Sequence, residues 1–153
     1  MKQYKVLQRA FSFLKKHNRE EKVAEILLQY VTKQTPASFY AQMQTELPET
    51  VYKRFQAMLT DHALHGTPIQ HMIGTAPFYG REFIVNEDVL IPRFETEEVV
   101  FHAIERMKQL VPEDESLTVV DLGTGSGIIA LTLALELPQL TVYATDVSNH
   151  ALQ

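Results

Sequence analysis

The segment VVDLGTGSGIIALTLALE, residues 119–136, constrains the fold more than any other part of this chain. Apolar residues surround Asp121, three glycines then alternate with Thr124 and Ser126, and an apolar run rich in alanine and leucine follows. This order predicts a buried strand, a glycine-rich turn and a helix. Glycines let the backbone approach a ligand closely, and a new helix offers free N–H groups at its positive end. The segment therefore predicts a loop that holds a nucleotide-like molecule.

The glycine spacing narrows the choice of ligand. The dinucleotide-binding pattern G-x-G-x-x-G would need a glycine at Ile128, whereas the third glycine here is Gly127. A phosphate-binding P-loop would need a lysine after its last glycine, and this segment has none. Asp146 ends the next apolar run, LTVYATD, and a carboxylate at that place suits the hydroxyls of a ribose. The alternative is a structural turn followed by a solvated aspartate.

The motif DLGTGSG resembles the first motif of Rossmann-like S-adenosylmethionine methyltransferases. Because that cofactor has no phosphate, the resemblance implies a loop that holds its ribose and its methionine moiety. The implied cofactor is S-adenosyl-L-methionine, and the implied binding residues are Asp121, Gly123, Thr124, Gly125, Ser126, Gly127 and Asp146.

Charge divides the chain unevenly. Residues 1–73 contain 10 basic and 6 acidic side chains, a net charge of +4, and the remainder contains 4 and 13, a net charge of −9, which together give the total of −5. Such asymmetry predicts two units with different partners. The basic half would suit an acidic protein or an RNA-associated partner, and the alternative is a merely solvated helical face.

Composition excludes several classes of protein. The chain has no cysteine, which excludes disulfides and thiolate metal sites. No apolar run is long enough to span a membrane, and the N-terminus lacks the apolar core of a signal peptide. We therefore expect a cytoplasmic protein without a membrane partner.

Four amphipathic helices are predicted in residues 1–73, and the first covers residues 4–16. Asn18 and Glu21 have the spacing of a capping box for the second helix. Thr35 and Pro36 are a cap and a first helical residue for the third, and the fourth ends near Gly66. Short connections between such helices predict a small α-helical bundle.

Histidines in and after the fourth predicted helix invite a metal-site hypothesis. His62 and His65 share a helix face, and His71 follows beyond the end of the helix. No acidic residue or fourth ligand is placed to complete the set, so we expect no metal.

From Pro68 onward the sequence changes character. Two short β-like pieces, residues 77–79 and 82–85, are separated by Gly80 and predict a hairpin. The motifs PIQHMIG, FYGREF, LIPRFETE and DLGTGSG then follow one another in order. In content and order they are similar to the protein-glutamine methyltransferases that modify peptide release factors. Two positions depart from the family pattern, since Phe94 replaces a proline and His71 stands where tyrosine is common.

The resemblance implies three parts. Residues 1–73 would be an α-helical bundle that recognises the partner, and residues 74–92 a β-hairpin linker. Residues 93–153 would be the first part of an α/β Rossmann-like methyltransferase domain. The implied enzyme transfers a methyl group from S-adenosylmethionine to the side-chain amide nitrogen of a glutamine in class I peptide chain release factors, a protein methylation in translation termination.

The segment from Arg93 to Glu97 has two interpretations. Its acids favour a helix start, and Thr96 is expected to cap that helix. The resemblance implies instead that Arg93, Glu95 and Thr96 contact the cofactor as the segment closes over it and the target glutamine. A well-capped helix with surface acids is the alternative.

The family's catalytic motif, Asn-Pro-Pro-Tyr, does not occur in this sequence. We therefore assign no catalytic residue and expect residues 1–153 alone to be inactive. Two predicted parallel strands, residues 117–122 and 140–146, would leave open edges and uncovered apolar faces. This incomplete domain is expected to be partly disordered, self-associated or swapped between chains.

Two other functions remain open at this point. One is a related amino-methyltransferase that acts on a nucleic-acid base. The chain offers no aromatic and basic groove for a flipped base, so no direct nucleic-acid binding is expected. The other, for these residues alone, is a non-catalytic helical interaction module.

Overall fold

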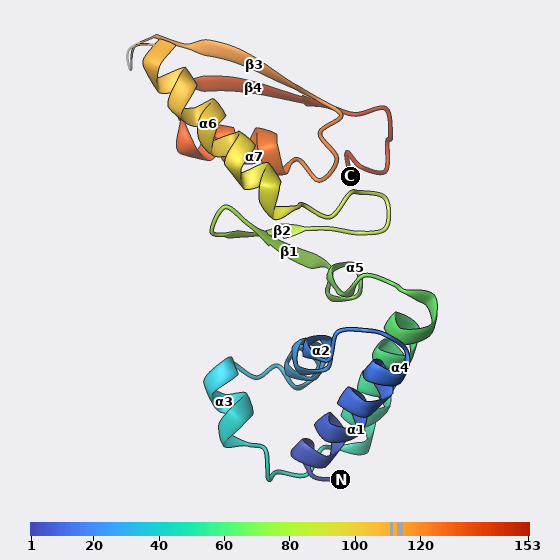
Figure 1. The fold of residues 1–153 in the computed structure, drawn as a ribbon. Coiled ribbons are helices and arrows are strands. Elements are labelled where there is room, and N and C mark those ends of the chain that lie inside the picture. The colour runs from blue at the N-terminus through green and yellow to red at the C-terminus, as the bar shows by residue number, and fades with distance from the viewer. Residues whose placement is uncertain (111, 113–114) are drawn as a thin grey trace. The chain divides into compact units, whose positions relative to one another are not determined.

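The computed structural model describes residues 1–110, 112 and 115–153, which form two compact units, Met1–Ile73 and Gly74–Gln153 (Figure 1). The first unit is helical, and the second begins with a hairpin and continues with alternating helices and strands. The expected fold class is therefore confirmed. A further division of the second unit at residue 92 stays a prediction. None of the helices in the described residues has the length and hydropathy that a transmembrane segment requires.

The first unit is a bundle whose helices pack their apolar faces together. Its most deeply buried side chains come from separate helices and include Leu14, Leu28, Phe39 and Phe55, each at most 1% exposed. The predicted bundle is thus correct, but a short fifth helix was not predicted. The helices are α1 (Gln3–Lys16), α2 (Lys22–Thr32), α3 (Pro36–Ala41), α4 (Glu49–His65) and α5 (Ile69–Ile73).

Helix α1 begins without a side-chain cap. The N–H groups of Gln3 and Tyr4 instead donate to the carbonyl oxygens of Thr45 and Met43, at 2.9 and 3.0 Å. In the opposite direction, the Leu47 N–H donates to the carbonyl oxygen of residue 1, at 3.0 Å. The segment between α3 and α4 therefore satisfies the N–H groups that a helix start leaves free.

The predicted capping box at Asn18 is wrong. Asn18 has a left-handed φ of 53°, and the next N–H, that of Arg19, donates to the Leu14 carbonyl oxygen at 3.0 Å. Asn18 thus ends α1, and Glu21 precedes α2 without a side-chain hydrogen bond. Asparagine is favoured both at helix starts and in the left-handed conformation after a helix, so its presence alone does not distinguish the two.

The predicted cap at Thr35 is confirmed. Its Oγ1 accepts a hydrogen bond from the Ser38 N–H at 3.3 Å, and Pro36 is the first residue of α3. Helix α4 likewise ends where expected, because Gly66 follows it with a φ of 77°.

A hairpin opens the second unit. Strands β1 (Thr75–Phe78) and β2 (Arg81–Ile84) pair antiparallel, with Phe78 opposite Arg81. Tyr79 and Gly80 form the two-residue turn, and their φ values of 49° and 73° are those of a type I′ turn, which suits the twist of a hairpin. The predicted hairpin is therefore correct, although its strands start and end one or two residues earlier than expected.

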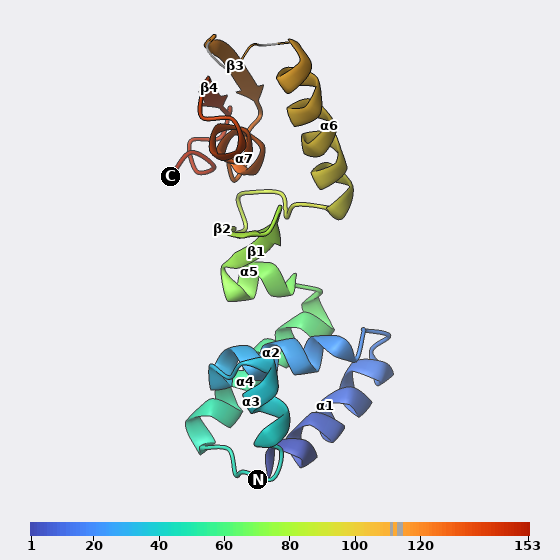
Figure 2. The ribbon, with the colours of Figure 1, turned by 90° about the vertical axis from the view of Figure 1, so that its left-hand side faces the viewer.

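The remaining elements form a parallel β-α-β unit preceded by a helix. Strands β3 (Leu117–Leu122) and β4 (Leu140–Thr145) pair in parallel, and α7 (Ile128–Glu136) connects them. Helix α6 (Phe94–Leu110) and α7 lie on the same face of this sheet (Figures 1 and 2). Their buried residues, among them Val100 and Ile128, pack against Val119 and Val142 of the strands.

The opposite face of the sheet is uncovered among the described residues. Val120, Leu122 and Tyr143 point to that face and are 53%, 80% and 58% exposed. The expectation of uncovered apolar surface is thus correct for one face, and the helices cover the other. Self-association through the open face stays a prediction.

Asn18 provides a test of how α1 ends. Replacing Asn18 by glycine removes the cost of a left-handed L-residue, so we expect Asn18→Gly to raise the free energy of unfolding by up to about 1 kcal/mol. Asn18→Ser should lower it, whereas a true N-cap would tolerate serine. Urea unfolding followed by far-ultraviolet circular dichroism measures both. Gln8→Gly, on an exposed position inside α1, is the control and should destabilise.

Candidate functional site

Residues 123–127 form the glycine-rich loop between β3 and α7. Gly123, Gly125 and Gly127 all have positive φ values, of 74°, 55° and 73°. At Gly125 an added Cβ would meet no atom within 4 Å, so the backbone conformation, rather than lack of space, requires glycine there. The predicted order of strand, turn and helix is therefore correct.

Asp121 connects the strand, the loop and the helix. Its Oδ2 accepts hydrogen bonds from Thr124 Oγ1 at 2.7 Å and from the Ala130 N–H at 3.3 Å. Ala130 is the third residue of α7, so Asp121 caps this helix from the strand before the loop. Sequence reasoning placed Asp121 among the cofactor-binding residues. Its contacts within the protein position the loop, and its contact with the cofactor stays a prediction.

Asp146 connects the same loop to the end of β4. Its Oδ2 accepts from the Gly125 N–H and its Oδ1 from the Ser148 N–H, both at 2.9 Å. These backbone N–H groups, Ser148 first, hold the pKa of Asp146 below its ordinary value, so the side chain is a carboxylate at neutral pH. Each oxygen has one such partner and can accept another hydrogen bond.

A second pair of contacts joins the loop to β4. The N–H groups of Gly123 and Thr124 both donate to the Thr145 carbonyl oxygen, at 2.8 and 2.9 Å. The sequence gives no signal for these bonds, because they depend on the register of the two strands. They place the loop at the carboxyl end of the sheet, where ligands bind in open α/β folds.

A hollow of about 350 Å³ lies beside the loop. Thr124, Gly125, Ser126 and Gly127 line it, together with small and apolar side chains of α7 and β4 and with residues 151–153. Its volume falls in the range of small-molecule sites. The structure therefore brings together four of the predicted loop residues, and Gly123, Asp121 and Asp146 support that loop without lining the hollow.

The predicted residues at the start of α6 lie elsewhere. Arg93, Glu95 and Thr96 do not line the hollow, and Thr96 does not cap the helix. The Thr96 N–H donates to the Arg93 carbonyl oxygen at 3.0 Å, which places Thr96 within the first turn. The predicted cap is wrong because the helix begins two residues earlier, at Phe94.

Two side-chain contacts that sequence reasoning missed hold the hairpin. Glu97 Oε1 accepts from the N–H of Tyr79 in the hairpin turn at 3.0 Å. Arg81 donates to Glu136 Oε1, in the last turn of α7, at 2.7 Å. The hairpin is thus tied to both helices of its unit. Only the charges of these residues are visible in the sequence, and their partners lie 18 and 55 positions away.

Two of these three histidines have partners within the protein, and the buried Nε2 of His71 has none among the described residues. His62 Nδ1 lies 2.9 Å from the Thr67 carbonyl oxygen, and His65 Nδ1 lies 2.7 Å from Asp61 Oδ1. Within the described ranges, no three histidines or acids gather where they could hold a metal ion.

The contact between Asp121 and Thr124 can be measured by a double-mutant cycle. Because Thr124 is buried and its hydroxyl donates to a carboxylate, we expect a coupling energy of about 1–3 kcal/mol between Asp121→Ala and Thr124→Val. Urea unfolding of the four variants provides this energy. Glu87→Ala, at an exposed acid, is the control and should not couple to Thr124→Val. A coupling energy near zero would show that Asp121 does not hold the loop.

Comparison with known proteins identifies the family. The model of the PrmC N-terminal domain matches residues 5–74, and the model of the methyltransferase small domain matches residues 103–153. The chain is 48% identical over 150 residues to a release factor glutamine methyltransferase of Bacillus subtilis, an alignment that covers 98% of this chain and 52% of the relative.

Two other similar proteins are also methyltransferases by name. A release factor glutamine methyltransferase of Bacillus cereus is 43% identical over all of this chain and 53% of its own length. A bifunctional methyltransferase of Rickettsia prowazekii is 38% identical over 85% of this chain and 28% of its own length. The chain spans about half the length of the first two relatives. By these similarities, the chain belongs to the release factor glutamine methyltransferase family.

Proposed function

We propose that the whole protein transfers a methyl group from S-adenosylmethionine to the side-chain amide nitrogen of a glutamine in class I peptide chain release factors. The observation that carries this proposal is the 48% identity, over 98% of the chain, to a relative named for that activity. The glycine loop, the ionised Asp146 and the adjoining hollow support it. Since release factors act on ribosomes, the proposed location is the cytoplasm.

The polar groups beside the loop fit the proposed cofactor. Asp146 is ionised and each of its oxygens has spare capacity, as the hydroxyls of a ribose require. The loop from Thr124 to Gly127 presents backbone and two hydroxyl side chains to the hollow without bulk. A proposed contact of Arg93, Glu95 and Thr96 with the cofactor rests on family resemblance alone.

The proposed reaction requires that the protein bind the cofactor and hold the target glutamine in line with it. S-adenosylmethionine supplies a methyl group activated by its sulfonium sulfur. A carboxamide nitrogen is a poor nucleophile because its lone pair is shared with the carbonyl, so it must be held in line while charge develops. The residues described here would bind and orient the cofactor through the loop and Asp146. The basic first unit would dock the protein substrate.

Cofactor binding can be tested at Asp146. We expect Asp146→Ala to weaken the binding of S-adenosylmethionine about tenfold or more, because it removes a charged acceptor and the anchor of the Gly125 N–H. Titration calorimetry on residues 1–153 measures this. Glu98→Ala changes the same charge in the same unit, at an exposed position of α6 that lines neither the hollow nor the loop, and should leave the affinity unchanged. Equal affinities of the two variants would contradict the assignment of Asp146.

The activity itself can be tested in cells. Deleting the gene that encodes this chain should remove one methyl group from a glutamine of the class I release factors, as measured by mass spectrometry of their peptides. Restoring the gene should restore the methyl group, and restoring it with Asp146→Ala should do so poorly. Unchanged methylation after deletion would overturn the proposed function.

A further inference from the structure

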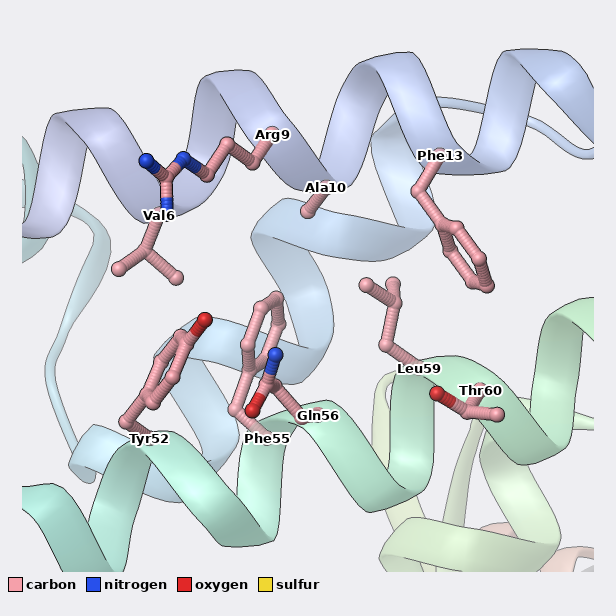
Figure 3. A pocket seen from close by; sticks show the side chains of 9 residues that line it. All are labelled: Val6, Arg9, Ala10, Phe13, Tyr52, Phe55, Gln56, Leu59 and Thr60. Carbon is pink, nitrogen blue, oxygen red and sulfur yellow. The ribbon is translucent and has the colours of Figure 1, made fainter.

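A second cavity, of about 320 Å³, lies in the first unit between α1 and α4 (Figure 3). Its inner wall is apolar and belongs to the core of the bundle. Val6 and Ala10 of α1 and Phe55 and Leu59 of α4 form this wall, and each is at most 6% exposed. The cavity is a depression open to solvent, because the exposed residues Arg9, Gln56 and Thr60 also line it.

The rim of the cavity is polar. Figure 3 shows Arg9 extending along α1, and Tyr52 and Gln56 rising from α4 on the opposite side. Among the hydrogen bonds and ion pairs of the described residues, none involves these three side chains. Their guanidinium, hydroxyl and amide groups are therefore available to a binding partner. An apolar pocket with a free polar rim is the usual arrangement around an anchoring side chain in a protein interface.

The exposed side of α1 continues this rim. Lys5, Gln8, Arg9 and Ser12 line an adjoining shallow hollow of about 430 Å³, so Arg9 belongs to both depressions. The first 19 residues carry six basic side chains and no acid, and α1 contains four of those bases. Basic side chains of α1, Lys5 and Arg9, thus lie beside the apolar cavity.

We propose that the cavity between α1 and α4 receives a large apolar side chain from an acidic segment of the protein substrate. The apolar wall would bury that side chain, and Arg9 with Lys5 would pair with the carboxylates beside it. The net charge of +4 on residues 1–73 favours an acidic partner at longer range. That the partner is a release factor rests on the proposed function.

The same features disfavour a nucleic acid as the partner. Single-stranded nucleic acids bind to basic grooves in which exposed aromatic faces stack on the bases. Here Phe55 of the inner wall is 1% exposed, and the other two aromatic residues that line the cavity, Phe13 and Tyr52, are half-buried. The basic residues border one apolar cavity on one helix and form no track across several elements. A protein side chain fits this surface better than a base does.

The test measures binding of residues 1–153 to a purified class I release factor by fluorescence anisotropy. Arg9→Glu reverses the charge of the rim, and Gln56→Trp covers the cavity from an exposed position of α4. Each variant should weaken binding at least about tenfold. The matched controls are Lys15→Glu on α1 and Ala57→Trp on α4, both at exposed positions outside the cavity, and these should stay within about twofold. Thermal unfolding of all four verifies the fold.

Each possible outcome either supports or overturns the proposed docking of an acidic protein segment. A release factor that binds the two rim variants as well as the controls, or that does not bind the unaltered chain, overturns the inference. A single-stranded RNA oligonucleotide whose binding depends on Arg9 while that of the release factor does not would assign the surface to nucleic acid. Sedimentation that shows dimers lost in Gln56→Trp would assign it to a second copy. The gene-deletion test of glutamine methylation does not depend on these binding results, so it tests the proposed function separately.

Discussion

The carboxylate of Asp121 is the contact on which the second unit depends most. It lies near the end of β3, accepts from the hydroxyl of Thr124 in the loop, and accepts from the Ala130 N–H in α7. One side chain thus fixes the exit of the strand, the shape of the loop and the start of the helix. Asp146 repeats this arrangement from β4 by accepting from the Gly125 N–H. The hollow beside the loop exists because these two acids hold its wall in place.

The two units are stabilised in different ways. The bundle buries apolar faces around a core that includes Leu28, Phe39 and Phe55, and its connections are short. The second unit packs two helices on one face of a two-stranded sheet and leaves Val120 and Tyr143 exposed on the other. Its hairpin depends on polar contacts from Glu97 and Arg81 as well as on packing. The bundle thus has one apolar core, whereas the buried apolar side chains of the second unit form two separate clusters.

Local patterns predicted most of the fold and part of the candidate site. The strand, loop and helix around Gly125 and the cap at Thr35 were predictable because each is encoded within a few consecutive residues. Asn18 was misassigned because the same residue type favours the start of one helix and the end of another. The hydrogen bonds of Asp121 to Thr124 and Ala130 were not predictable because they depend on how strand and helix meet in space. The cavity beside Arg9 depends on the separation of α1 from α4, which no sequence pattern records.

The first residues of the chain and the segment between α3 and α4 share their hydrogen bonds. Gln3 and Tyr4 donate to Thr45 and Met43, and Leu47 donates back to residue 1. Neither segment can fray alone without leaving the groups of the other unpaired. They therefore open as one cooperative element, so a protease that cuts near Thr45 would report on the order of the amino terminus as well.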